Sequence, residues 1–189
     1  MRFVHDLIAS PLGDLTMIAS EQGLAALLWP DDAPARVPMP RGDRVPDHPL
    51  LRQAGAQVQA YFAGQRRHFD LPLDFHGTSF QKVVWQALLS IPYGETRSYA
   101  AIAQAIGRPT ACRAVGAANG RNPISIVAPC HRVVGTNGAL TGFAGGLEAK
   151  RYLIDHERST IRAGEREWRT QEDSNLWPLP SEGREAVFP

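Results

Sequence analysis

The first 30 residues alternate short apolar runs with turn signals, a pattern typical of β-strands. The runs FVHDLIA, LTMIAS and LAALLW are separated by turn-forming residues at 11–13 and 21–23. Three such runs with short connections are most simply arranged as an antiparallel meander. The chain is therefore expected to open with a small sheet.

A connection and a helix follow this sheet. Residues 30–49 contain six prolines and little periodicity, which predicts an exposed connection. Apolar positions at helical spacing then predict a helix over residues 50–64, and Gly64 suits its C-terminal end. We expect residues 1–75 to form an N-terminal domain, a small antiparallel sheet with one helix.

Helical periodicity dominates the next part of the chain. Thr78 and Gln81 fit a capping box. The apolar stripe of the helix that follows consists of Phe80, Val83, Val84, Ala87 and Leu88. Two short helical patterns come next, with Ser98 and Thr110 as their N-terminal caps and Gly120 at the end of the second. Their tight, glycine-containing turn suggests a helix-turn-helix, although the pattern alone favours an ordinary helical hairpin.

The rest of the chain predicts a strand, a loop and a last helix. The apolar run 124–129 predicts a buried strand that leads into Cys130, and a glycine-rich loop precedes a helix over 147–157. Periodicity then fades, so residues 159–189 are expected to be a disordered or loosely attached tail, or a reading-frame extension without a selected role. The expected fold class is α+β, with a mostly helical C-terminal domain over 76–158.

Composition and charge narrow the setting in which the chain works. The net charge of its 189 residues is +1, so no global positive field indicates nucleic acid, and any such contact depends on a local surface. Two cysteines, Cys112 and Cys130, cannot form a disulfide framework, which favours a reducing compartment. Asp6 interrupts the N-terminal apolar run, and no run reaches the about 20 residues of a membrane span. We expect a soluble, cytoplasmic protein that does not contact membranes.

Cys130 stands directly before His131, a combination that suits nucleophilic chemistry. Only a thiolate attacks, and an imidazole can take the thiol proton. Because adjacent side chains diverge in a strand, this needs a turn at Pro129 or a bridging water. Glu157 is the leading carboxylate to orient the imidazole. By themselves these residues are a weak signal, because most cysteines are small buried hydrophobes and Glu157 could be an exposed helix-end residue.

A longer set of motifs is far more specific. PCHRVVG, with IPYGETRSYAAIA before it, RAVGAANGRNPISIVAP between and GFAGGLEAKRYLIDHE after, resembles the O6-alkylguanine-DNA alkyltransferase family. The resemblance covers about residues 78–158, is looser in the N-terminal part, and is greatest to bacterial single-function members. It implies direct-reversal DNA repair, in which the alkyl group on O6 of guanine, and on O4 of thymine, passes irreversibly to Cys130 in a single turnover.

The resemblance also implies a role for individual residues. His131 would be the water-mediated base and Glu157 the carboxylate that orients it. Asn122 would bridge loop and helix near the active site. Tyr99 would donate a proton to the leaving guanine, and Arg113 would replace the extruded base in the stack.

The second helix of the pair and the region after Cys130 would contact the DNA and the base. Small side chains let a helix approach the minor groove, about 6 Å wide, without reading bases. The residues assigned to this contact are Thr110, Arg113, Ala114, Ala117 and Gly120. The base pocket would be formed at Val133, Phe143 and Ala144. Local positive charge would come from Arg108, Arg113, Arg121 and Arg132.

The implied partner is double-stranded DNA containing O6-alkylguanine, bound through its minor groove by a monomer with no obligate protein partner. Two positions depart from the family pattern. Cys112 replaces a small residue and is assigned no catalysis, and Ser125 stands where some members have proline, which leaves tolerance of bulky alkyl groups open. The zinc ligands of some members are missing from the sequence, so neither metal nor cofactor is expected.

Three other functions fit parts of the pattern. A non-catalytic sensor of alkylated bases would lack the acceptor thiol, and the intact Cys130 argues against it. A cysteine hydrolase would share the cysteine, histidine and glutamate but needs an oxyanion hole and turnover. A helix-turn-helix transcription factor would read the major groove, for which the Ala/Gly-rich helix has few suitable side chains.

Overall fold

The computed structural model describes residues 2–174, with side chains through residue 166. Its N-terminal part is a four-stranded sheet of order β3-β2-β1-β4. Strands β1 (Val4–Ile8), β2 (Leu15–Ala19) and β3 (Leu24–Leu28) form the predicted antiparallel meander. The short β4 (Asp43–Arg44) pairs in parallel with β1 and lies within the segment expected to be only a connection.

Both faces of this sheet are covered. Helix α1 (Pro49–Phe62) packs on one face through a buried stripe that includes Leu51, Ala54 and Val58. Gly64 follows the helix with a φ of +72°, the left-handed conformation that favours glycine, as predicted. On the other face, Val37 and Met39 from the proline-rich connection pack against the sheet, so this connection is not simply exposed.

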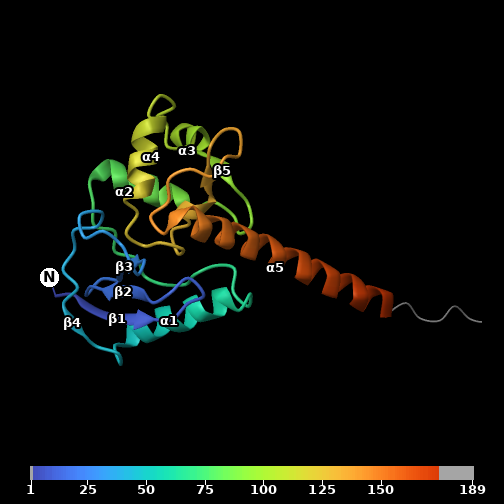
Figure 1. Ribbon diagram of the computed structural model, residues 1–189, viewed down its shortest axis with the longest axis horizontal. Coiled ribbons are helices and arrows are strands. Elements are labelled where there is room, and N and C mark those ends of the chain that lie inside the picture. The colour runs from blue at the N-terminus through green and yellow to red at the C-terminus, as the bar shows by residue number, and fades with distance from the viewer. Residues whose placement is uncertain (1, 175–189) are drawn as a thin grey trace, which may run out of the picture.

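The C-terminal part contains three helices close together, α2 (Ser79–Leu88), α3 (Tyr99–Ala105) and α4 (Cys112–Gly120) (Figure 1). The predicted capping box of α2 is present, and the Ser98 hydroxyl accepts the Ala101 N–H at the start of α3. The predicted Thr110 cap is wrong. The turn after α3 ends one residue later than predicted, so Ala111 is the N-cap residue of α4. Its methyl side chain makes no capping bond.

The packed face of α2 also differs from the predicted stripe. Val83 is 50% exposed, whereas Val84, Trp85 and Leu88 are buried. Trp85 is drawn inward because its indole Nε1 donates to the Ala118 carbonyl, 2.8 Å away on α4. A polar handle on a large ring thus fixes which side of α2 faces the core.

The run 124–129 is buried as predicted, but it is not a strand. It forms successive turns, with a single bridge between Ile124 and Leu27 of β3 and a positive φ of 69° at Ile126. The apolar run is buried because it joins the core shared by α1 and the sheet. The strands flanking the site are instead β5 (Arg97–Ser98) and β6 (Val133–Val134), paired in parallel.

The last helix, α5 (Gly146–Ser174), is much longer than predicted. It projects from the body in Figure 1, and residues 159–174 are helical, so the predicted disorder of the tail is wrong for them. Within this extension, Ile161 packs against Gly94 and Thr160 against Gly64. Residues 175–189 of the predicted tail lie outside the described residues, and the domain limits at 75 and 158 stay predictions. Among residues 2–174, no helix is long and apolar enough to cross a membrane.

Candidate active site

Cys130 opens a short 3₁₀ turn, Cys130–Arg132, that begins directly after Pro129. The predicted turn at Pro129 is therefore present. The thiol is 3% exposed, and this burial raises its pKa above the ordinary value, while the Asn122 side chain, Arg36 and Lys150 act in the opposite direction. Cys130 consequently rests as a neutral thiol and needs a base before it can attack.

The base and its orienting carboxylate are both buried. His131 Nε2 lies 2.8 Å from Oε1 of Glu157, a residue of α5. Burial raises the pKa of Glu157, but the hydrogen bonds from His131 and Arg132 outweigh it and hold the pKa at about 2. Burial lowers the pKa of His131, partly offset by its bond to Glu157. The pair is thus a carboxylate and a neutral imidazole at neutral pH.

These charge states fix the tautomer of His131. Because an ionised carboxylate only accepts hydrogen bonds, Nε2 of His131 carries the proton that it donates to Glu157. Nδ1 then has a free lone pair, and it makes no hydrogen bond to protein atoms in the described part of the chain. An imidazole in this state is ready to accept the proton of a thiol.

Arg132 is not part of the DNA-facing charge, which corrects that prediction. Its side chain is 7% exposed, and its Nε and Nη2 donate to the two oxygens of Glu157 at 2.9 Å. Its Nη1 donates to the Ile91 carbonyl at 2.6 Å, and the Tyr93 ring lies 5.5 Å from the guanidinium carbon. A guanidinium with this many internal partners neutralises the buried carboxylate and is turned away from solvent.

Asn122 holds the loop that carries the thiol. Its Nδ2 donates to the Ala128 carbonyl at 2.7 Å, and its Oδ1 accepts the Ile124 N–H at 3.1 Å. The same side chain acts against the burial that raises the pKa of the Cys130 thiol. Asn122 therefore joins the end of α4 to the active-site loop, as the resemblance implied.

Arg36 reaches the same loop from the N-terminal part. Its Nη1 donates to the Asn122 carbonyl at 2.7 Å and to the Gly120 carbonyl at 3.3 Å, while Asp32 pairs with the other side of the guanidinium. Sequence reasoning missed this residue. The only local signal was a pair of opposite charges four residues apart in a proline-rich segment.

Tyr99 lies beside the glycine-rich loop. Its hydroxyl donates to the Thr141 carbonyl at 3.4 Å, and the buried Lys150 donates to the same carbonyl at 2.7 Å. The Lys150 ammonium lies 5.9 Å from the centroids of both the Tyr99 and the Phe143 rings. Lys150, also missed from the sequence, therefore joins the proposed proton donor to the proposed base pocket.

The three predicted pocket residues have different surroundings. Val133 is fully buried in β6, so its backbone alone could meet a base. The Phe143 ring packs edge-on against Trp29 of the N-terminal part, 5.4 Å between centroids. Ala144 lines a surface cavity of about 440 Å³ together with Trp29 and Tyr152. Phe143 also packs against the buried cluster that contains Cys130 and Val133.

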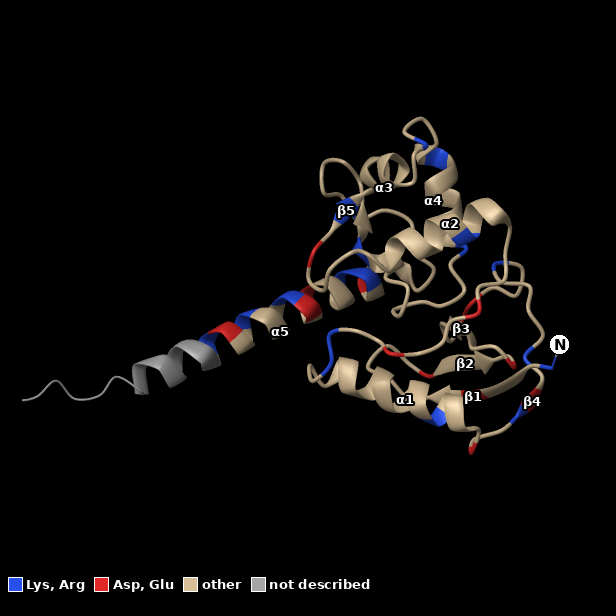
Figure 2. Ribbon diagram, turned by 180° about the vertical axis from the view of Figure 1, so that it is seen from behind, with Lys and Arg blue, Asp and Glu red and all other residues tan. Residues whose placement is uncertain are grey.

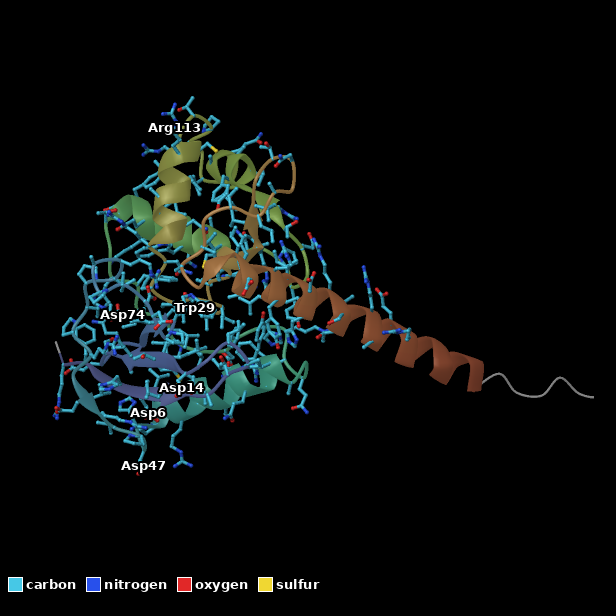
Figure 3. All side chains as sticks on the ribbon, viewed as in Figure 1. Asp6, Asp14, Trp29, Asp47, Asp74 and Arg113 are labelled. Carbon is cyan, nitrogen blue, oxygen red and sulfur yellow. The ribbon has the colours of Figure 1, made fainter. Side chains whose placement is uncertain are left out.

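The predicted DNA-contacting residues lie on α4, except Thr110, which precedes the helix. Thr110, Arg113, Ala114 and Ala117 are exposed, and Gly120 is half-buried. Figure 2 shows this end of the molecule carrying Lys and Arg but no acidic residues, and Figure 3 places Arg113 at the outer tip of α4, away from the body.

In residues 2–174 no cluster of His, Cys, Asp or Glu could hold a metal ion.

Comparison with known proteins decides the family. The model of the 6-O-methylguanine DNA methyltransferase DNA-binding domain matches residues 79–159, and that of the ribonuclease-like domain of the same proteins matches residues 3–75. The chain belongs to this methyltransferase family. The predicted family and the α+β fold class are therefore confirmed.

Related methyltransferases match along nearly their whole length. A methylated-DNA–protein-cysteine methyltransferase of Methanosarcina barkeri is 47% identical over 158 residues, which is 84% of this chain and 99% of that protein. The Mycobacterium tuberculosis protein of the same name is 49% identical over 158 residues, 82% of this chain and 93% of that protein. The match therefore includes both parts of the methyltransferase.

Solved structures agree with these matches. The crystal structure of Mycobacterium tuberculosis O6-methylguanine methyltransferase has a TM-score of 0.74 at 46% identity, covering 84% of this chain and 94% of that one. Mycobacterium tuberculosis OGT in complex with DNA has a TM-score of 0.73 at 46% identity, covering 85% and 94%.

Proposed function

We propose that Cys130 is the alkyl acceptor of this chain in the activity of its family, the repair of O6-alkylguanine in DNA by irreversible transfer to a cysteine. O4 of thymine is a second site of attack. The observation that carries the proposal is the buried Cys130–His131–Glu157 set, in which an ionised carboxylate fixes a neutral imidazole next to a thiol. The protein is methylated-DNA–protein-cysteine methyltransferase by reaction type.

Binding precedes chemistry. The outer face of α4 enters the minor groove, where Ala114 and Ala117 permit close approach without reading bases. The target base leaves the stack at a cost of a few kcal/mol, and Arg113 fills the gap. A complex of a 46% identical relative with DNA supports the binding of DNA. The protein acts as a monomer in the cytoplasm, with no obligate protein partner.

The chemical step needs two proton transfers, one from the thiol of Cys130 and one to the departing guanine. The thiol proton of Cys130 passes through a water to Nδ1 of His131, and Glu157 stabilises the imidazolium that forms. The thiolate attacks the alkyl carbon, the bond from that carbon to guanine O6 breaks, and the hydroxyl of Tyr99 protonates the departing base. The thioether product has no good leaving group, so the protein is consumed.

The alternatives differ in what they require of Cys130. A sensor of alkylated bases needs no activated thiol, whereas here Cys130 directly precedes a buried imidazole whose Nδ1 is free to accept a proton. A hydrolase passes through an ester intermediate that water can cleave. Alkyl transfer to Cys130 gives a thioether, which water does not cleave. A hydrolase also gives no reason for the exposed, small-residue face of α4.

Peptide mapping tests the acceptor directly. The protein is incubated with duplex DNA containing O6-methylguanine, digested and analysed by mass spectrometry. The peptide containing Cys130 should gain the mass of one methylene unit, and Cys130→Ser should gain none, because a hydroxyl stays protonated where a paired thiol can ionise. Cys112 is the internal control, and a methyl group on it instead would overturn the assignment.

A further inference from the structure

The Glu157 carboxylate also accepts hydrogen bonds from outside the Cys130–Arg132 turn. Oε1 of Glu157 accepts a hydrogen bond from the Tyr61 hydroxyl at 2.9 Å, and Oε2 accepts the Gly94 N–H at 2.8 Å. Tyr61 belongs to α1 in the N-terminal part and is 96 residues away from Glu157 in the sequence. The oxygen that it contacts is the one that orients His131.

Tyr61 is held rigidly in this position. Its side chain is fully buried, and its ring lies between aromatic neighbours, with the Tyr93 ring edge-on at 6.0 Å and the His156 ring tilted at 5.4 Å. His156 Nε2 also hydrogen-bonds the Tyr61 carbonyl at 2.8 Å. Burial, with the nearby Glu157, raises the pKa of Tyr61 well above its ordinary value, so the hydroxyl remains a donor at neutral pH.

We propose that Tyr61 is a positioning residue for alkyl transfer, which holds Glu157 Oε1 where it keeps His131 oriented and able to accept the thiol proton. The N-terminal part thereby completes the activating set rather than only supporting it. This inference rests on the proposed acceptor role of Cys130.

The expected effect follows from competition for one oxygen. Each donor to a carboxylate draws off part of its negative charge, so removing the Tyr61 hydroxyl leaves Oε1 more attractive to the proton of His131. His131 then binds a second proton more readily and is more often imidazolium, which cannot accept from the thiol. The titratable and charged groups facing this pair are Cys130, Arg132 and Lys150, together with Tyr93 and Tyr61.

The test compares Tyr61→Phe with the unmodified chain between pH 5 and 9. Tyr61→Phe keeps the ring and removes only the donor. The transfer rate at neutral pH should fall at least tenfold, the usual worth of a hydrogen bond to a charged group. The loss should be equal on duplex DNA and on the free modified base, because the step affected is thiol activation. The acid limb of the rate profile should move to higher pH.

Val58→Ala is the matched control, because Val58 is fully buried one turn earlier on α1. It should lower the melting temperature without moving the acid limb. NMR titration of the His131 imidazole, which needs neither DNA nor transfer, should give a higher pKa in Tyr61→Phe alone. An unchanged acid limb and unchanged titration in Tyr61→Phe would overturn the proposal, as would an equal shift in Val58→Ala.

A double variant separates positioning from general stabilisation. If Tyr61 acts through Glu157, adding Tyr61→Phe to Glu157→Gln should reduce the rate no further, whereas independent effects would multiply. Multiplying effects would contradict the inference. Failure of the proposed function looks different, because the unmodified chain would then transfer no alkyl group to Cys130 at all.

Discussion

At the scale of single residues, Glu157 sets the charge state of the site. It is 1% exposed, yet its hydrogen bonds with His131 and Arg132 outweigh burial and hold its pKa at about 2. The same carboxylate keeps the Nε2 proton of His131 in place and leaves Nδ1 free to act as a base. Sequence chemistry and the family motif together predicted this histidine and glutamate. Neither indicated that Arg132 neutralises the carboxylate, because the motif does not reveal which way its arginine turns.

Glu157 should also make stability pH-dependent. Its pKa is about 2 in the folded chain against a reference value of 4.5, so the unfolded chain binds the proton first as the pH falls. The contribution is present above about pH 4.5 and lost toward pH 2. Glu157→Gln should destabilise the fold by about 3 kcal/mol at pH 7, since Arg132 loses its buried counter-charge.

Urea unfolding between pH 3 and 8 measures this effect. The loss of stability toward acid should be shallower in Glu157→Gln than in the unmodified chain, because the main group that titrates in this range has been removed. Parallel curves for the two proteins would show that Glu157 is not responsible for the acid sensitivity.

At the scale of elements, local signals predicted most helix ends, with the Thr110 cap as an exception, whereas the apolar run 124–129 was assigned to the wrong element. The capping box at Thr78, the Ser98 cap and the terminal Gly64 depend on neighbours within four residues, so the sequence contains their full cause. The run 124–129 would be buried whether it formed a strand or a turn, so its apolar residues alone do not distinguish the two. Hydrogen bonds from Asn122, outside the run, decide for the turn.

The exposed tip of α4 carries a prediction about base extrusion. Arg113→Ala should reduce repair of duplex DNA at least tenfold more than reaction with the free modified base, because only the duplex requires the base to leave the stack. Arg108→Ala is the control, since Arg108 is also exposed on this surface and would contribute charge without entering the stack. Equal losses on duplex and free base would remove Arg113 from the extrusion step.

At the scale of the whole molecule, the N-terminal part contacts the active site at three points. Leu27 of β3 accepts and donates backbone hydrogen bonds to the loop, Arg36 clamps the Asn122 carbonyl, and Tyr61 reaches Glu157. These partners are 86 to 98 residues apart in the sequence. Periodicity and capping signals are local, so they could predict the elements but not these contacts.

The length of α5 leads to a prediction about truncation. Removing residues 165–189 keeps Thr160 and Ile161, so the melting temperature should change by no more than about 2 °C. Removing residues 159–189 also takes away the packing of Ile161 on Gly94 and should lower it by several degrees. Differential scanning calorimetry measures the melting temperatures of the two deletion proteins and of the full chain. A large loss in the shorter deletion would show that the fold depends on residues beyond 164.

The central claim is that each molecule transfers one alkyl group to itself and stops. The most direct measurement is the amount of repaired guanine formed when duplex DNA containing O6-methylguanine is in tenfold excess over the protein. Product should reach one equivalent of active protein and rise no further with time, because the thioether on Cys130 cannot be released by His131 and water. Continued product formation well beyond one equivalent would contradict the account and indicate a turning-over hydrolase.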